Sequence, residues 1–314
     1  MKKVDISTKI GGVTLDTCIF NTSGPRDETL PLLQIIGSSK SSAIMMKSCT
    51  LEPRTGNLEP RYVALPNKSS INSMGLPNLG YREYVKFVPI LQEQFNKPVV
   101  ASISGMTLKD NIVMFNAFNK TGVDLIEFNP GSPNTIGKPI VGYDIQEMDR
   151  LLSAVSKACE IPWGVKLPPY FDFVHFEEIA EVLTKYPISF ITCINSIGNG
   201  LVIDPEKEQT VIKPKGGFGG IGGVVIKYTA LANTRKFYEL LGDKIQIIGV
   251  GGISSGIDAF EFILAGASAI QLGTVYMQEG PTCFERIQRE LIEYMRKKNY
   301  KTIDDFRGKL KITD

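Results

Sequence analysis

One loop of this chain combines side chains that can read a polar ligand with a side chain that can move a proton. Asn129, Ser132 and Asn134 lie in a Gly- and Pro-containing segment that directly follows the apolar run 123–126. The run predicts a buried strand, and parallel α/β folds place their chemistry in loops at the carboxyl ends of strands. Two amides can pair with a planar ligand that has several donors and acceptors, and the hydroxyl between them can accept a proton. We therefore predict an active site at this loop, with Ser132 as a candidate catalytic group.

Other common catalytic and metal-binding residues are scarce. The chain has one histidine, His175, so neither a Ser-His-Asp triad nor a histidine-rich metal site is expected. An isolated histidine in an aromatic stretch is more typical of packing or of a helix start, and we predict no metal site. The five cysteines are odd in number and show no C-x-x-C spacing, which favours free thiols in a reducing compartment.

Composition and charge limit the class of protein. The 314 residues are 43% hydrophobic and 22% charged with a formal net charge of +2, so one large core is expected and nucleic acid is not a predicted partner. The N-terminus reaches Asp5 without an apolar segment of signal-peptide length, and no run approaches about 18 apolar residues. We predict a soluble, cytoplasmic protein with no membrane partner. No linker or repeat appears, so residues 1–314 are expected to form a single domain.

The elements that must position the loop alternate between two hydrophobic periods. Apolar runs predict strands at 17–21, 43–46, 98–103, 123–128, 163–166, 188–194, 245–249 and 269–272. Segments with helical period predict helices at 28–37, 81–95, 108–120, 145–159, 173–185, 227–241, 256–265 and 281–298. Eight such pairs favour a closed (β/α)₈ TIM barrel over an open doubly wound sheet. An open sheet would carry G-x-G-x-x-G after its first strand, and residues 23–26 (Ser-Gly-Pro-Arg) do not fit that pattern.

Glycine clusters follow the last two predicted strands. Gly251 and Gly252 come after the seventh strand, and Gly273 precedes Thr274 after the eighth. In barrels the loops after these two strands commonly bind phosphate, because backbone N–H groups converge there without side chains in the way. Tight turns alone would explain either cluster. The two together favour a phosphate site.

Two longer segments are expected on the same face of the barrel. Residues 48–80 form a long insertion whose Pro, Asn and Gly content disfavours a helix, and loops of this length are usually functional or covered by a neighbour. Residues 216–223, which include Gly223, resemble a flexible linker by composition. Their place between the sixth strand and the sixth helix instead predicts a third wall of the phosphate site.

Three lysines are predicted to point at the mouth of the barrel. Lys47 closes the second strand, Lys166 closes the fifth, and Lys213 follows the sixth, where a surface position is the alternative. Lys166 lies in the apolar context 163–167, and a buried lysine requires an anion. A flavin can supply one, because its reduced ring carries negative charge at the N1–C2 edge.

Four motifs resemble those of dihydroorotate dehydrogenases of class 1A. They are residues 72–78 (Asn-Ser-Met-Gly-Leu-Pro-Asn), 164–172 (Gly-Val-Lys-Leu-Pro-Pro-Tyr-Phe-Asp), 195–200 (Asn-Ser-Ile-Gly-Asn-Gly) and 211–215 (Val-Ile-Lys-Pro-Lys). The similarity extends from about Ile19 to Lys311. It implies a soluble, homodimeric barrel with FMN at the C-terminal face of the strands. It also implies oxidation of dihydroorotate to orotate in pyrimidine (UMP) biosynthesis, with fumarate as the electron acceptor.

The resemblance implies roles for individual residues as well. Those that would hold FMN are Thr22, Ser23, Gly24, Lys47, Lys166, Gly223, Gly251, Gly252, Gly273 and Thr274. The substrate carboxylate would contact Lys47 and the backbone of Met74, Gly75 and Leu76. The side chains that would pair with the pyrimidine amides are Asn72, Asn129, Asn134, Asn195 and Ser196.

The match departs at the proton-accepting position. The class 1A pattern is Asn-Leu-Ser-Cys-Pro-Asn with the cysteine as base, whereas residues 129–134 read Asn-Pro-Gly-Ser-Pro-Asn, with Ser132 at the cysteine position. An alcohol lies about five pKa units above a thiol, so full deprotonation requires about 7 kcal/mol more. Class 2 enzymes use a serine, but with an N-terminal membrane-associating extension that this sequence does not show. Ser70 and the pair Pro25-Arg26 also differ from the family pattern. Several differences favour natural divergence over a single engineered cysteine-to-serine substitution.

Three hypotheses follow for the function. The first is an FMN-dependent dihydroorotate dehydrogenase with Ser132 as base. The second is a paralogous FMN oxidoreductase that acts on another small acid. The third is a flavin-free lyase that uses Lys166 in a Schiff base, or an inactive flavin-binding relic. The resemblance also leaves open a partner subunit with FAD and an iron–sulfur cluster, as in class 1B, although the motifs are closer to class 1A.

Overall fold

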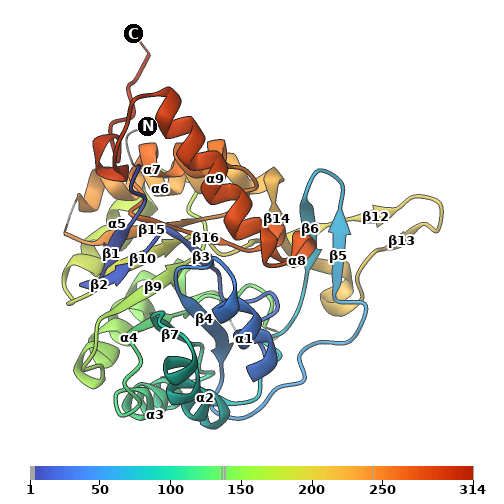
Figure 1. The fold of residues 1–314 in the computed structure, drawn as a ribbon. Coiled ribbons are helices and arrows are strands. Elements are labelled where there is room, and N and C mark those ends of the chain that lie inside the picture. Colours follow the sequence, from blue (N-terminus) through green and yellow to red (C-terminus); the bar gives the residue numbers. More distant parts are fainter. Residues whose placement is uncertain (1–3, 136, 138, 243, 314) are drawn as a thin grey trace.

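Eight parallel strands form the central sheet of the computed structural model, which describes residues 4–135, 137, 139–242 and 244–313. Each strand lies beside that of the next β/α unit, in the order β3-β16-β15-β10-β9-β8-β7-β4 (Figure 1). Their bounds are β3 Ile19–Asn21, β4 Ile44–Cys49, β7 Val99–Ile103, β8 Leu125–Phe128, β9 Trp163–Leu167, β10 Phe190–Cys193, β15 Gln246–Val250 and β16 Ala269–Leu272. The predicted (β/α)₈ barrel is confirmed.

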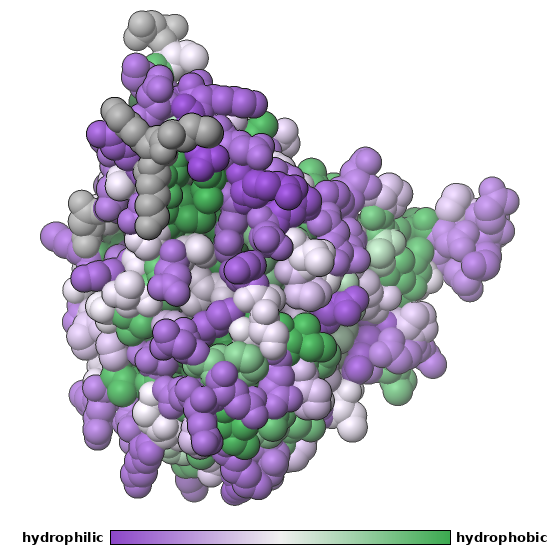
Figure 2. All heavy atoms as spheres, viewed as in Figure 1, coloured by the Kyte–Doolittle hydropathy of each residue, from purple (hydrophilic) through white to green (hydrophobic). Residues whose placement is uncertain are grey.

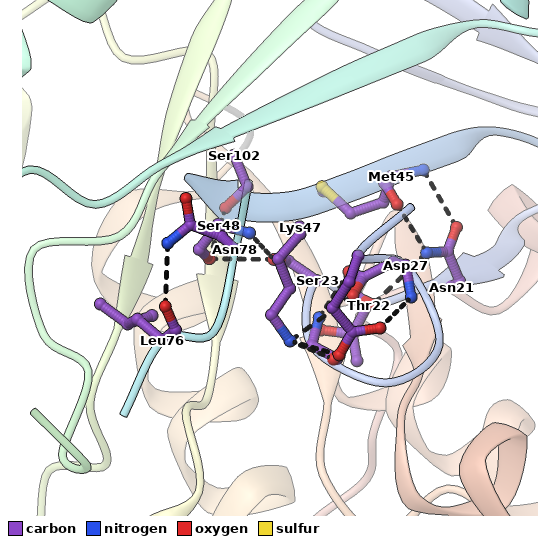
Figure 3. Close-up of polar contacts among 12 residues, drawn as sticks. Asn21, Thr22, Ser23, Asp27, Met45, Lys47, Ser48, Leu76, Asn78 and Ser102 are labelled. Atoms are coloured by element: carbon purple, nitrogen blue, oxygen red, sulfur yellow. Dashed lines mark hydrogen bonds and ion pairs between the residues drawn. The ribbon is translucent and has the colours of Figure 1, made fainter. Parts of the chain in front are cut away.

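A side chain completes the barrel between β3 and β4. Asn21 is fully buried, its Oδ1 accepts a hydrogen bond from the Met45 N–H at 3.0 Å, and its Nδ2 donates to the Met45 carbonyl at 2.8 Å. Both bonds appear in Figure 3, where the Asn21 amide faces the edge of β4. A backbone bond from the Ser42 N–H to the Ile19 carbonyl adds to the contact. The Asn21 amide thus takes the place of a strand backbone at the seam of the barrel.

Helices cover the outside of the barrel (Figure 1). Their bounds are α1 Leu30–Ser38, α2 Tyr81–Gln94, α3 Leu108–Phe118, α4 Ile145–Ala158, α5 Phe173–Thr184, α6 Lys227–Leu241, α7 Gly256–Ala265, α8 Thr274–Glu279 and α9 Thr282–Lys297. Thr107, Asp144 and Ser255 each accept a hydrogen bond from the first turn of the helix that follows, which explains where α3, α4 and α7 begin. The predicted helices agree with these to within a few residues. The short helix α8, which begins directly after Gly273, was not predicted.

The barrel interior has an apolar layer and a polar layer. The apolar layer includes Phe20, Met45, Phe190 and Ile248, which are contributed by four different strands. Nearer the carboxyl ends of the strands, Glu127 on β8 is fully buried, and its Oε2 accepts hydrogen bonds from Thr192 Oγ1 at 2.8 Å and Gln271 Nε2 at 2.9 Å. Alternate residues of each strand point into the barrel and fill it in layers. The layer that is polar here is the one nearer the carboxyl ends of the strands.

A hairpin closes the opposite end of the barrel. Strands β1 (Thr8–Ile10) and β2 (Val13–Leu15) pair antiparallel, and Ile10 and Leu15 pack into the apolar layer. The Gln246 amide accepts from the Gly11 N–H at 2.8 Å and donates to the Lys9 carbonyl at 2.6 Å, which ties the hairpin to β15.

A second, four-stranded antiparallel sheet covers the carboxyl ends of the barrel strands, and we call it the roof sheet. Its order is β11-β14-β6-β5, with bounds β5 Tyr62–Leu65, β6 Ser69–Asn72, β11 Ile197–Leu201 and β14 Phe218–Gly223. The insertion at 48–80 thus contributes β5 and β6, and the linker reading of 216–223 is wrong, because β14 pairs with a strand on each side. A small hairpin, β12 (Ile203–Asp204) and β13 (Gln209–Thr210), projects beyond the roof sheet (Figure 1).

Polar side chains cover most of the face shown in Figure 2, including the tip of the projecting hairpin. Within the described part of the chain, no helix has both the length and the apolar character needed to cross a membrane.

Candidate active site

A cavity of about 330 Å³ lies between the carboxyl ends of the barrel strands and the roof sheet. With the exception of Lys213, the residues to which the sequence assigned a role line it. These residues are Thr22, Ser23, Gly24, Lys47, Asn72, Met74, Gly75, Leu76, Asn129, Ser132, Asn134, Lys166, Asn195, Ser196, Gly223, Gly251, Gly252, Gly273 and Thr274. The structure therefore brings residues from the carboxyl ends of seven barrel strands and from the roof sheet to a single site.

Four asparagines on one side of the cavity form two pairs. Asn195 Nδ2 donates to Asn129 Oδ1 at 3.0 Å, and Asn134 Nδ2 donates to Asn72 Oδ1 at 2.7 Å. The backbone of Asn129 is fixed at the end of β8, because its N–H donates to the Ile103 carbonyl at 2.8 Å and its carbonyl accepts from Ser104 Oγ at 2.8 Å. Asn129 Nδ2 also donates to Ser48 Oγ and Asn72 Nδ2 to the Gly220 carbonyl, both at 3.3 Å, so the pairs are held to β4 and to the roof sheet.

Two amide side chains that line the cavity carry buried acceptors without a protein donor. Asn134 Oδ1 and Gln271 Oε1 have no hydrogen-bond partner among the described residues. A buried acceptor that stays unpaired destabilises a fold by about 1–3 kcal/mol, so a ligand that donates hydrogen bonds would gain affinity here. The backbone of Asn134 is fixed by another amide, because Asn57 Nδ2 donates to the Asn134 carbonyl at 3.1 Å and to the Ser73 carbonyl at 2.8 Å.

Ser132 is half-buried and lines the same cavity as the two asparagine pairs. Asn195 Nδ2 also donates to the Gly131 carbonyl at 3.3 Å, which links the serine loop to the end of β10. The loop therefore holds a hydroxyl beside several amide groups, as the sequence predicted.

Lys166 extends from β9 into the polar layer and is 4% exposed. Its Nζ donates to Thr22 Oγ1 at 2.7 Å and lies 3.8 Å from Glu127 Oε1. Burial lowers the pKa of Lys166, and the nearby carboxylates of Glu127 and Asp27 oppose that shift. The site thus contains a desolvated amine whose charge responds strongly to any anion placed beside it.

Lys47 reaches the cavity because β4 is irregular at that point. The register between β4 and β7 shifts between Met45 and Ser48, so both Lys47 and Ser48 face the cavity, which a regular strand would not allow. The Lys47 Nζ donates to the Gly24 carbonyl and to Glu28 Oε1 at 3.3 Å, and it lies 3.6 Å from Asp27 Oδ1. Figure 3 shows the ammonium group pointing at the 23–27 loop rather than into open space.

Glycines form another part of the cavity wall. A Cβ at Gly222 would lie 3.1 Å from Thr274 Oγ1, and one at Gly223, where φ is +84°, would lie 2.1 Å from the Lys68 carbonyl. Gly252 has φ +79°, and α8 begins at Thr274, where the first N–H groups of a helix have no partner within the helix. The wall combines bare backbone with the start of a helix, and the phosphate site stays a prediction.

Several residues near the cavity were not predicted from the sequence. Asp27 and Glu28 contact Lys47, and Gln271 bonds to Glu127 within the polar layer. Nothing in the local sequence separates them from other polar residues, because their partners lie on other strands. Lys213, predicted to point at the mouth, is exposed and lies outside the lining residues.

The scarce residue types lie away from the cavity. His175 Nδ1 lies 2.6 Å from Asp172 Oδ2 at the start of α5, and neither residue lines the cavity. No group of three His, Cys, Asp or Glu side chains suited to a metal ion occurs among the described residues. All five cysteines are free, as predicted.

Comparison with known proteins places the chain in a family. The family model for dihydroorotate dehydrogenase matches residues 5–295. A protein of Streptococcus agalactiae named putative dihydroorotate dehydrogenase A (fumarate) is 48% identical over 309 residues, which cover 98% of this chain and 99% of the relative. A dihydroorotate dehydrogenase (fumarate) of Trypanosoma cruzi is 49% identical over 297 residues, 93% of this chain and 94% of the relative.

A solved structure confirms the fold. The crystal structure of DHODH from Eimeria tenella in complex with ferulenol superposes with a TM-score of 0.82 at 19% identity, and the match covers 98% of this chain and 89% of the other. The motifs, the cavity and the full-length similarity agree, and the chain belongs to the dihydroorotate dehydrogenase family.

Proposed function

We propose that this protein is an FMN-dependent oxidoreductase that converts dihydroorotate to orotate in pyrimidine (UMP) biosynthesis, with fumarate as the electron acceptor. The names of the relatives that match nearly the whole chain support the reaction and the acceptor. The observation that carries the proposal is the cavity, where Ser132 and the asparagine pairs lie together with the buried amine of Lys166.

The residues of the cavity fit a flavin mononucleotide. The bare glycine backbone and the start of α8 suit a single phosphate, and Lys166 suits the edge of an isoalloxazine ring that becomes negative on reduction. When bound, FMN supplies the acceptor for the hydride that leaves C6 of the substrate. The residues that would hold it are Thr22, Ser23, Gly24, Lys47, Lys166, Gly223, Gly251, Gly252, Gly273 and Thr274.

The amide groups of the cavity fit a pyrimidine. Its ring N–H groups and carbonyls would pair with Asn72, Asn129, Asn134, Asn195 and Ser196, and the unpaired Asn134 Oδ1 is suited to a ring N–H. The substrate carboxylate would contact Lys47 and the backbone of residues 74–76 (Met-Gly-Leu). Gly75 suits close approach, because its φ is +73° and a Cβ there would lie 2.3 Å from Asn57 Oδ1.

Ser132 is the proposed base. Its Oγ would take the proton from C5 of dihydroorotate while the C6 hydride leaves. An alcohol is the weaker base by about five pKa units relative to a thiol, so we expect proton removal to limit the rate. The asparagine pairs would hold the substrate so that C5 stays beside Oγ, which reduces the entropy lost on reaching the transition state.

A specific observation keeps the paralogue hypothesis as a second candidate. Lys47, the expected carboxylate ligand, is already in contact with Asp27 and Glu28, and Arg26 lines the mouth of the cavity. With Lys47 paired to carboxylates, Arg26 is a second cation that would suit another small acid. The family assignment favours either flavin enzyme over a flavin-free lysine lyase.

Anaerobic titration of the purified holoenzyme with dihydroorotate tests the proposal. We expect a flavin band near 450 nm that bleaches on addition of dihydroorotate and returns with fumarate. Stopped-flow reduction across pH 6 to 9 should show that Ser132→Cys is faster and follows a thiol-like pKa, whereas Ser132→Ala, the matched control, is slower than the wild type. Full flavin content with no bleaching in any of the three proteins would refute the dihydroorotate reaction and favour the paralogue.

We also propose that the protein acts as a single-domain, cytoplasmic homodimer. Leu201, Ile203 and Phe218 have side chains that are 45%, 59% and 43% exposed on and beside the roof sheet, and contact with a second copy would cover them. Size-exclusion chromatography with light scattering would measure the mass of the protein in solution. A monomer at micromolar concentration would refute the dimer.

A further inference from the structure

The ammonium group of Lys47 is occupied by the protein itself. A lysine ammonium has three N–H donors. One donates to the Gly24 carbonyl and one to Glu28 Oε1 at 3.3 Å, and the third side of the group faces Asp27 Oδ1 at 3.6 Å. An acidic ligand that binds Lys47 therefore competes with these acceptors.

Asp27 is an unusual neighbour for such a site. It is fully buried, its Oδ2 accepts from the Gly24 N–H at 2.7 Å, and its Oδ1 has no hydrogen-bond partner among the described residues. A buried carboxylate with one free oxygen is poorly stabilised unless the cation beside it remains in place. Glu28, whose side chain is 27% exposed, lines the cavity on the other side of the ammonium group.

The charges around Asp27 are nearly balanced. The charged and titratable side chains that face it are Lys47 on β4, Glu28 beside it, Lys166 on β9, Tyr84 on α2 and Tyr276 on α8. Glu127 lies 3.8 Å from Lys166, and the adjacent Arg26 is exposed, so Lys47 and Lys166 are the buried cations near these carboxyl groups. Burial and the Glu28 charge raise the pKa of Asp27 to about 6, although Lys47 opposes the shift.

We propose that Asp27 and Glu28 form an internal counter-anion for Lys47, so that an acidic ligand binds to Lys47 together with a proton taken up by Asp27. Asp27 is thereby a positioning residue that acts through Lys47 and sets the charge specificity of the cavity. The choice of orotate as a probe rests on the proposed function. A ligand carboxylate replaces the Asp27 charge, and the proton prevents the count of buried negative charges from rising.

The proposal predicts a pH-dependent affinity. If only the Asp27-protonated form binds, a pKa of about 6 makes half of the protein competent at pH 6 and about one part in 100 at pH 8, so the dissociation constant rises roughly 50-fold over that range. Orotate remains a carboxylate anion throughout, so its own charge does not produce the trend.

The test uses the holoenzyme, flavin absorbance changes to measure orotate binding, and calorimetry in buffers of different ionisation enthalpy to count protons. We expect the wild type to take up close to one proton at pH 8. Asp27→Asn should bind orotate tens of times more tightly at pH 8, with little pH dependence and no proton uptake. Asp149→Asn removes an acid that lies at the same 3.6 Å from a lysine on the outer surface, and it should behave as the wild type.

Further arms of the test keep the outcomes separate. If Asp27→Asn does not fold, Glu28→Gln should still tighten binding at pH 8, and the proton count of the wild type stands by itself. Acetate and fumarate are titrated in parallel. Proton-linked binding of these two without orotate binding would refute the proposed function and support the counter-anion. Equal pH profiles for the wild type and Asp27→Asn, or no proton uptake, would overturn the counter-anion proposal. Failure of all three anions to bind at any pH would overturn it as well.

Discussion

Replacement of Asn21 by alanine should strongly destabilise the barrel. Asn21 is fully buried, and its amide satisfies both the N–H and the carbonyl of Met45 at 3.0 and 2.8 Å. The mutation leaves two buried backbone groups unpaired at about 1–3 kcal/mol each, so we expect a loss of about 3–5 kcal/mol. Small movements of β3 and β4 toward each other would reduce this loss of stability.

Urea unfolding of the apoprotein, followed by far-UV circular dichroism, measures this loss without stabilisation by bound flavin. The matched control is Gln34→Ala, which removes a partly exposed amide that bonds to Gln94 at 2.8 Å and should change the free energy of unfolding by less than about 0.5 kcal/mol. Asn21→Asp keeps the acceptor but buries a carboxylate, so its stability should recover as the pH falls through the raised pKa of that group. A loss below about 1 kcal/mol for Asn21→Ala would refute the role of the amide in closing the barrel.

Three further predictions follow from the cavity. Lys166→Met should weaken FMN binding at least about tenfold, because a charge-assisted contact contributes about 1.5–3 kcal/mol, and unchanged affinity in a fluorescence titration would contradict that role. Gly223→Ala should lower stability by about 2–4 kcal/mol, because its φ is +84° and its Cβ would lie 2.1 Å from the Lys68 carbonyl. Gly24→Ala, where φ is +144° but no atom lies near the Cβ, carries the backbone strain without the clash and should be milder in thermal unfolding. The pKa of folded Asp27 is raised to about 6, so this group favours the folded state below about pH 4 and loses that contribution as the pH rises through 6. Asp27→Asn should therefore reduce the pH dependence of the melting temperature between about pH 4 and 6.

The barrel could be predicted because its signals are local. Apolar runs and helical periods each lie within one element, and N-terminal caps such as Thr107 and Ser255 mark where helices begin. The glycine-rich strand β14 was harder, because glycine disfavours strands. Its conformation depends on hydrogen bonds to β6 and β11, which come from distant parts of the chain.

The same distinction applies to the site. Asn129 and Ser132 follow one predicted strand and Lys166 ends another, so the strand ends predicted their location. The contacts of Lys47 could not be predicted, because they depend on an irregularity in β4 and on a loop that folds back over the ammonium group. Sequence motifs therefore predicted which residues line the cavity but not how their charges are paired.

The roof sheet has a consequence for the order in which the molecule assembles. Ser69 pairs with Gly223 and Asn72 with Gly220, so strands about 150 residues apart must meet before the cavity has a cover. Closing so long a loop is entropically unfavourable until the intervening barrel strands hold its ends together. The binding surface should therefore be among the last parts to form. Pulsed hydrogen exchange should show protection at Ser70 and Ile221 later than at the centre of β9, and a nascent chain that ends before β14 has no complete cavity.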